Sequence, residues 1–196
     1  MTVRLPAVLR HPAYRLLVGG QVASNVGDAF YAVALPWYVL GHHGGAVLLG
    51  LVLAAYGIPR IVLVAVGGQA ADRWSPWTVM MGADLTRAAT VTGLGVAALA
   101  GPPRAAVLIP IAAVIGAGEG LFLPGSMSII PALLPDSELQ SGNALSSAGT
   151  QLATLVGPAV GGGLVALAGA APAFFLDAGS FLVSAATLAG IRARAR

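Results

Sequence analysis

The chain has 196 residues, of which 57% are hydrophobic and 9% are charged, and its mean hydropathy is +0.86. Soluble domains carry about 25% charged residues, so this composition indicates an integral membrane protein. The chain contains no cysteine, which excludes disulfides, thiol nucleophiles and thiolate metal sites. Its net charge of +3 comes from arginines scattered at segment ends, which argues against nucleic acid as a partner.

Six apolar segments are long enough to cross a bilayer, because a hydrocarbon core of about 30 Å needs roughly 20 apolar residues as a helix. In chain order they run over residues 16–40, 46–71, 77–100, 105–130, 142–168 and 172–191. Short polar or glycine-rich breaks separate them, and the longest is 131–141. The sequence therefore predicts an all-α polytopic membrane protein. We expect an N-terminal segment (1–15), a six-helix transmembrane bundle (16–191) and a short tail (192–196).

The arginines also predict the orientation of the chain in the membrane. Basic residues favour the cytoplasmic side, and they cluster before the first segment, between the second and third, and after the sixth. The other side holds only Arg104. We therefore expect both termini in the cytoplasm of a cell-membrane protein, which requires an even number of spans and agrees with six.

A weak internal repeat relates the first three segments to the last three. Similar residues recur at offsets of 91 to 94 positions: Gly27-Asp28 with Gly118-Glu119, Gly67-Gly68 with Gly161-Gly162, and Asp84 with Asp177. Three spans are an odd number, so two consecutive three-helix units have opposite topology. We therefore predict two inverted three-helix repeats, at about 16–100 and 105–191.

Five ionisable residues lie inside the apolar segments and away from the turns: Asp28, Arg60, Asp84, Glu119 and Asp177. An Asp or Arg at a helix centre costs about 2.5–3.5 kcal/mol on insertion scales, so such residues normally face a cavity or a partner. Asp28 and Glu119 lie near the middle of the first and fourth segments. Two interpretations stay open for them: they line a functional pathway, or Arg60 neutralises one of them in a purely structural pair.

The stretch Gly67-Gly68-Gln69-Ala70-Ala71-Asp72-Arg73, followed by Asp84-Leu85-Thr86-Arg87, resembles the loop between the second and third helices of the major facilitator superfamily. The sequence departs from the family pattern at 74–77, where basic residues are usual. The resemblance implies a conformational latch formed by Gly68, Asp72, Arg73, Asp84 and Arg87, and the alternative is an ordinary solvated turn. We expect Asp84 near the start of its helix, where the macrodipole favours it, on one face with Arg87.

A second motif, Gly157-Pro158-Ala159-Val160-Gly161-Gly162, resembles the fifth-helix motif of antiporters of this superfamily. Pro158 removes a backbone donor and kinks a helix, and the glycines allow another helix to approach closely. The family's upstream glycines are replaced by alanines, so a generic packing kink is the alternative. The stretches 19–28 and 122–135 further resemble the branch that contains siderophore and macrolide exporters.

The resemblance implies one N-terminal six-helix half of a transporter. In this superfamily the first and fourth helices line the central cavity, so it places Asp28, Glu119 and Arg60 on a substrate and proton pathway. The implied function is proton-coupled export of amphipathic small molecules, without cofactor or metal. The expected partners are the bilayer, the small-molecule substrate and a second six-helix half, and the substrate, coupling ion and direction stay open.

Two alternatives compete with this interpretation. Typical carriers of the superfamily have two halves, so we expect a truncated or split carrier. A half-size carrier that dimerises, or a remnant with an assembly or regulatory role and no transport of its own, stays open. An intramembrane protease is the enzyme alternative, and we do not expect it. All three histidines (His11, His42 and His43) lie outside the spans, and Asp28 lacks the Gly-x-Gly-Asp context of aspartyl versions.

Overall fold

A computed structural model of the chain describes residues 7–194, apart from the side chains of residues 70–72, 193 and 194. Six long helices account for most of the described chain: α1 (Pro12–Gly41), α2 (Gly45–Trp74), α3 (Pro76–Ala100), α4 (Ala105–Ile129), α5 (Leu139–Ala168) and α6 (Ala170–Arg194). Three 3₁₀ turns flank them: η1 (Ala7–Arg10), η2 (Ile130–Ala132) and η3 (Asp136–Glu138). The predicted all-α class and the six segments are confirmed. Residues 1–6, 195 and 196 of the predicted terminal segments lie outside the described residues.

The turns between helices are short, so consecutive helices fold back on one another. α2 and α3 are separated only by Ser75, whose φ of +78° lies in the left-handed region. Gly169, with a φ of +82°, separates α5 from α6. One predicted boundary was wrong here: residues 72–74 were expected in a loop, but α2 continues through Trp74. Asp72 and Arg73 therefore belong to the last turn of a helix.

Four of the six helices are long and apolar enough by composition to cross a membrane, within the part of the chain that the structure describes. They are α2, α4, α5 and α6, with candidate spans Gly45–Gln69, Ala105–Ala132, Asp136–Ala168 and Ala170–Arg192. α1 and α3 carry polar or charged residues in the middle of their length, including Asp28 on α1 and Asp84 on α3.

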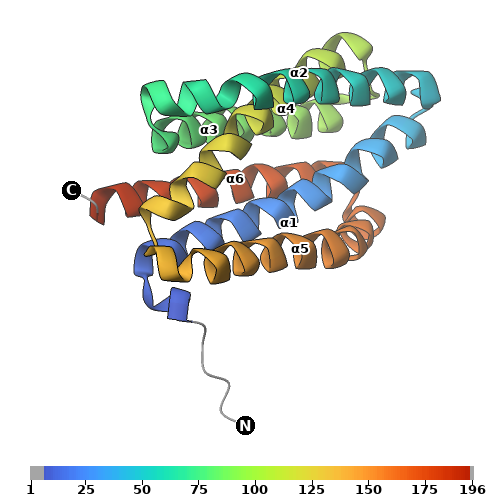
Figure 1. Ribbon diagram of the computed structural model, residues 1–196. Coiled ribbons are helices and arrows are strands. Elements are labelled where there is room, and N and C mark those ends of the chain that lie inside the picture. The colour runs from blue at the N-terminus through green and yellow to red at the C-terminus, as the bar shows by residue number, and fades with distance from the viewer. Residues whose placement is uncertain (1–6, 195–196) are drawn as a thin grey trace.

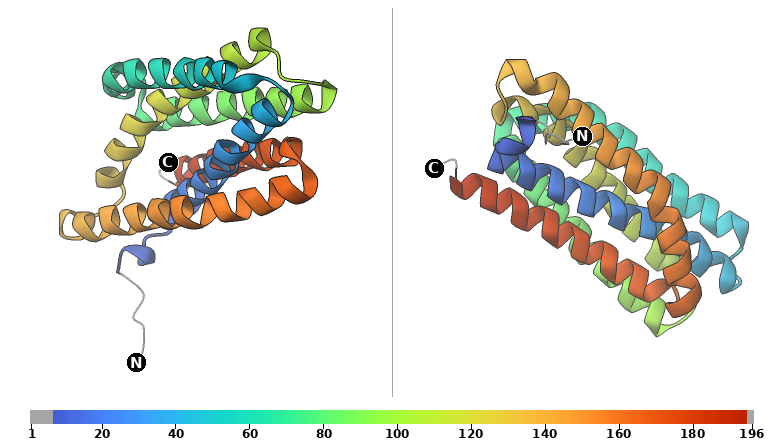
Figure 2. Two further views of the ribbon diagram at one scale, coloured as in Figure 1. Left: turned by 90° about the vertical axis from the view of Figure 1, so that its right-hand side faces the viewer. Right: turned by 90° about the horizontal axis from the view of Figure 1, so that it is seen from below.

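The six helices form two groups of three that meet through α3 and α6. α4 packs against α2 and α3, while α1 packs against α5 and α6. Figures 1 and 2 show the α2–α3–α4 group on one side and the α1–α5–α6 group on the other. Exchanging α1 with α4, α2 with α5 and α3 with α6 maps this contact pattern onto itself.

The repeat extends to individual close contacts between helices. A Cβ atom placed on Gly67 of α2 would lie 3.0 Å from the carbonyl oxygen of Gly120 on α4. A Cβ atom placed on Gly161 of α5 would lie 3.6 Å from the carbonyl oxygen of Ala29 on α1. Gly161 lies 94 positions after Gly67, and Ala29 lies 91 positions before Gly120, so the two contacts are related by the same offsets as the sequence repeat. The predicted three-helix repeat is therefore visible in the packing.

Two apolar clusters occupy opposite ends of the bundle and leave a polar layer between them. One cluster gathers residues such as Leu35, Leu94 and Phe174. The other gathers residues such as Tyr14, Met80 and Leu188. Along α1, α3 and α4 the ionisable residues lie between the two clusters, whereas Asp177 on α6 is flanked by Phe174 and Ala178 of the first cluster. The polar groups are therefore concentrated around mid-height of the bundle.

Candidate functional site

A cavity of about 730 Å³ opens at mid-height of the bundle. This volume is within the range of small-molecule sites. Residues of α1, α2, α3, α4, η2 and α5 line it: Gln21, Ser24, Asn25, Asp28, Arg60, Arg87, Glu119, Phe122, Leu123, Ser126, Met127, Ile130, Asn143, Ser146, Ser147, Thr150 and Gln151. Most of these side chains are polar. The cavity is therefore a polar chamber inside an otherwise apolar bundle.

Two polar stripes form much of its wall. On α1 the lining residues Gln21, Ser24, Asn25 and Asp28 recur at intervals of three and four, which places them on one helix face. The lining residues of α5, from Asn143 to Gln151, follow the same interval. The two stripes are joined where the Asn25 side-chain amide donates a hydrogen bond of 3.0 Å to Thr150 Oγ1.

The three residues predicted for a substrate and proton pathway line this same cavity. Arg60 Nη2 lies 3.0 Å from Glu119 Oε1, and the Tyr56 hydroxyl donates a hydrogen bond to Glu119 Oε2. Asp28 also lines the cavity, but its carboxylate makes no hydrogen bond or ion pair within the described residues. Of the two partners considered for Arg60, the structure pairs it with Glu119.

The residues predicted for a latch fall into two separate places. Asp84 and Arg87 are buried and bonded to each other, with 2.5 Å between Asp84 Oδ1 and Arg87 Nη2. Arg73 is exposed at the end of α2, and Gly68 faces open space. The side chain of Asp72 lies outside the described residues. The expectation that Asp84 lies near the start of its helix was wrong, because α3 begins two turns earlier, at Pro76.

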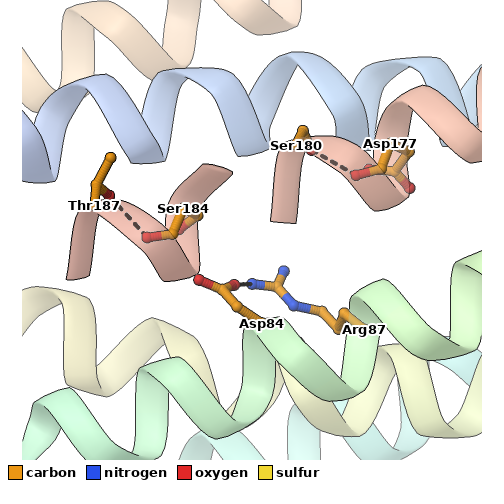
Figure 3. A network of polar contacts seen from close by, with 6 residues as sticks. All are labelled: Asp84, Arg87, Asp177, Ser180, Ser184 and Thr187. Carbon is orange, nitrogen blue, oxygen red and sulfur yellow. Dashed lines mark hydrogen bonds and ion pairs between the residues drawn. The ribbon is translucent and has the colours of Figure 1, made fainter. Parts of the chain in front are cut away.

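The Asp84–Arg87 pair lies between α3 and α6, and Figure 3 shows Asp84 pointing toward Ser184. The guanidinium of Arg87 also contacts two aromatic rings, with its Cζ 4.8 Å from the centroid of Phe122 and 4.2 Å from that of Phe181. Arg87 reaches the cavity wall as well. These two residues therefore do not form a solvated turn: they connect the interior of the bundle to the cavity.

The Gly-Pro motif of α5 produces a close contact with α1. Gly157 and Gly161 face Ala29 and Phe30 of α1, and a Cβ atom placed on Gly161 would lie 3.3 Å from Phe30 Cα. Gly162 faces open space. Pro158 lies within α5, which continues through it. The motif thus brings α5 against α1 directly beside Asp28.

Sequence reasoning missed several residues of the site. Tyr56, which bonds Glu119, and the polar stripe of α5 were not singled out. The stripe carried a usable signal, because polar residues recur at helical intervals in an apolar segment. Tyr56 carried no such sequence signal, since tyrosine is common in apolar segments and its partner, Glu119, lies 63 positions away.

An apolar helical bundle with a polar, charged chamber at its centre has the architecture of a membrane transporter. The comparison with protein families agrees with this class. Residues 5–196 match the family described as "Transmembrane secretion effector", and the chain belongs to this family of the major facilitator superfamily. It is a multi-pass membrane protein of a transporter family and not an enzyme.

Curated relatives include efflux pumps of bacteria. The chain is 31% identical to the "Multidrug efflux pump Tap" of Mycobacterium tuberculosis over 93% of the chain and 45% of the pump. It is 28% identical to the pump of the same name in Mycolicibacterium fortuitum, over 90% of the chain and 44% of the pump. It is 28% identical to the "Uncharacterized MFS-type transporter YfiS" of Bacillus subtilis, over 88% of the chain and 40% of that protein. The chain thus spans less than half the length of these relatives.

Proposed function

We propose that this chain provides one six-helix half of a proton-coupled exporter of amphipathic small molecules, with both termini in the cytoplasm. The observation that carries the proposal is the polar cavity, in which Asp28 contributes a carboxylate without an ion-pair partner among the described residues. Its similarity to multidrug efflux pumps supports export as the direction.

A second six-helix half completes the chamber in this proposal. Several lining residues of α5 are exposed, including Asn143, Ser147 and Gln151. Polar side chains facing hydrocarbon are costly, so such a stripe favours contact with protein or with a water-filled cavity. The relatives are about twice as long as the chain, which supports a second half as the cover. That half belongs either to the same polypeptide or to a separate one.

In this proposal, Asp28 is the residue that binds either the proton or the transported molecule. A carboxylate without a direct ion-pair partner can bind either a proton or a positively charged group on the cargo, so the two compete for it. Glu119 already accepts bonds from Arg60 and Tyr56, and its role is to change partners as the halves move. The C-terminal part of α2 with Gly68, Asp72 and Arg73, together with the Asp84–Arg87 pair, serves as the latch. Close packing at Gly157 and Gly161 guides α5 along α1.

The test uses everted membrane vesicles from cells that make the natural gene product. Uptake of a fluorescent amphipathic dye into these vesicles is driven by an imposed proton gradient. We expect D28N to lower the initial rate at least tenfold and E119Q to lower it less, with unchanged amounts of protein in the membrane. D136N is the matched control, because Asp136 is exposed in η3 and should leave the rate unaltered.

Wild-type rates in both D28N and E119Q would remove these residues from the pathway. The absence of any proton-driven uptake by the wild-type product, over a range of dyes, would contradict transport and support an assembly or regulatory role. Native mass spectrometry of the same membranes reports whether the second half is on the same polypeptide.

A further inference from the structure

Asp177 on α6 is a buried carboxyl group that the proposed transport cycle does not use. Its side chain is 1% exposed, and its Oδ1 has no hydrogen-bond partner among the described residues. Two neighbouring atoms share this condition, Asp84 Oδ2 and Arg87 Nε. Figure 3 shows the three residues around the space between α3 and α6, with Ser180 bonded to the backbone carbonyl of Asp177.

The charges of this cluster do not balance. Two carboxyl groups, Asp84 and Asp177, accompany one guanidinium, and Arg87 is paired with Asp84 at 2.5 Å. The rings of Phe122 and Phe181 flank that guanidinium. An ionised carboxylate without a partner is strongly disfavoured in such an interior. A carboxyl group that cannot be paired is accommodated more cheaply in its neutral, protonated form.

Asp177 is separated from the cavity by a single helix face. A Cβ atom placed on Gly27 of α1 would clash with Ser180 Oγ and lie 2.6 Å from Asp177 Oδ1, so the side chains of Ser180 and Asp177 together fill the space that this glycine leaves open. The next residue, Asp28, lines the cavity. Helix α1 therefore separates Asp177 from the cavity at Gly27, which places no side chain between them.

The titratable groups around Asp177 come from three helices. The charged groups that interact electrostatically with the Asp177 carboxyl group are Asp28 of α1, Arg87 of α3 and Glu119 of α4. Tyr31 of α1 faces it too, and the Tyr31 hydroxyl has no partner among the described residues. α5 carries no titratable side chain along its length. All three of Asp28, Arg87 and Glu119 also line the cavity, and Glu119 is already paired with Arg60, so Asp28 and Arg87 remain the candidate links between Asp177 and the cavity.

We propose that Asp177 is a second proton-binding residue, placed behind the cavity wall and linked to the cavity through Asp28 and Arg87. The proton passes from a hydronium ion in the cavity to the Asp28 carboxylate and from Asp28 to a carboxylate oxygen of Asp177, leaving water in the cavity, an ionised Asp28 and a neutral Asp177 carboxyl group. When Asp177 releases this proton, Arg87 is the cation that would neutralise it, because the Nε of Arg87 has no hydrogen-bond partner among the described residues. Proton release at Asp177 would thus draw Arg87 away from Asp84 and change the cavity wall. This coupling rests on the proposed transport function, whereas the proton on Asp177 does not.

The first test detects the proton itself by infrared spectroscopy of the full natural product in lipid nanodiscs at neutral pH. We expect the wild-type protein to show the carbonyl stretch of a protonated carboxylic acid. D177N should lose one such carbonyl group, and the matched control D136N should lose none. Because the amide of asparagine is neutral and close in shape to a protonated carboxyl group, D177N should keep the wild-type thermal unfolding midpoint.

A second variant covers the case in which D177N does not accumulate. D177E retains a carboxyl group at position 177. In protein labelled with ¹³C-aspartate, the carbonyl band of Asp177 in the wild type should shift, whereas the band of the unlabelled glutamate in D177E should not. A band unchanged by D177N, or absent from the wild type, overturns the proposal. An absent band together with stabilisation by Na⁺ would assign the site to a cation instead, and this outcome also overturns it.

The transport arm uses the vesicle assay described above. Proton-driven dye uptake should fall at least tenfold in D177N, and an unchanged rate overturns the link to transport. If the wild-type product shows no uptake but the infrared band is lost in D177N, the proton on Asp177 is supported while the transport function fails. The two proposals can thus fail separately.

Discussion

Arg60 Nη2 and Glu119 Oε1 are 3.0 Å apart, and this ion pair joins α2 to α4 at the wall of the cavity. The Arg60 side chain is 42% exposed and that of Glu119 is 23% exposed. The Tyr56 hydroxyl bonds the other oxygen of the same carboxylate. The pair therefore holds two neighbouring helices together while both of its members remain accessible from the cavity.

Removing the cation should cost more than removing both members of the pair. R60M leaves Glu119 charged and without a cation, whereas R60M/E119Q removes both charges. Neighbouring residues typically couple by about 0.5–3 kcal/mol, and we expect the lower end because Arg60 is partly exposed. A double-mutant cycle on thermal unfolding in nanodiscs measures the coupling. Additive effects of the two substitutions would show that the pair adds no net stability.

The glycines of the α5 motif should differ in their tolerance of a side chain. A Cβ atom at Gly161 would lie 3.1 Å from Phe30 Cδ1, whereas Gly162 faces open space. We expect G161A to destabilise the bundle by about 1–3 kcal/mol through overpacking. G162A is the matched control, and alanine's higher helix propensity should make it neutral or slightly stabilising. Equal unfolding midpoints for the two variants would contradict the close approach of α5 to α1.

Two tyrosine hydroxyls offer a second matched comparison. The Tyr14 hydroxyl donates a 2.6 Å hydrogen bond to the carbonyl oxygen of Gly142 and so ties α1 to α5. The Tyr31 hydroxyl is buried without a partner among the described residues. We expect Y14F to lower the free energy of unfolding by about 1 kcal/mol and Y31F to leave it unchanged or raise it. Thermal unfolding measures both, and a larger loss in Y31F would contradict these assignments.

Single cysteines should distinguish the water-filled cavity from the lipid-facing surface. The chain has no cysteine of its own, so each introduced thiol is unique within it. Gln151 lines the cavity from α5, while Leu167 of the same helix is 91% exposed on an apolar surface. We expect Q151C to react with a membrane-impermeant maleimide many times faster than L167C, because thiolates form in water and not in hydrocarbon. Denaturing in detergent should equalise the two rates, and equal rates in intact membranes would place α5 differently.

The polar residues show where sequence reasoning reached the site and where it failed. Asp28, Arg60 and Glu119 were found because ionisable residues in apolar segments are costly and rare. Arg60 had two candidate partners in the sequence, and only the packing of α2 against α4 selects Glu119. Asp84 and Arg87 were expected at an accessible turn, but they are buried against α6. The sequence pattern placed them three residues apart on one face and carried no information on what that face touches.

The sequence by itself determined the helical class, the six segments and the repeat that relates them. These properties depend on the length and composition of local stretches, and the bilayer imposes one length on each of them. The tertiary structure alone decided that Arg60 meets Glu119, that the Asp84–Arg87 pair is buried against α6, and that Asp177 lies against Gly27 behind the cavity wall. Such pairings depend on how each helix is rotated and which helix lies beside it. Rotation and neighbours are set by contacts between residues far apart in the chain, which no local stretch of sequence records.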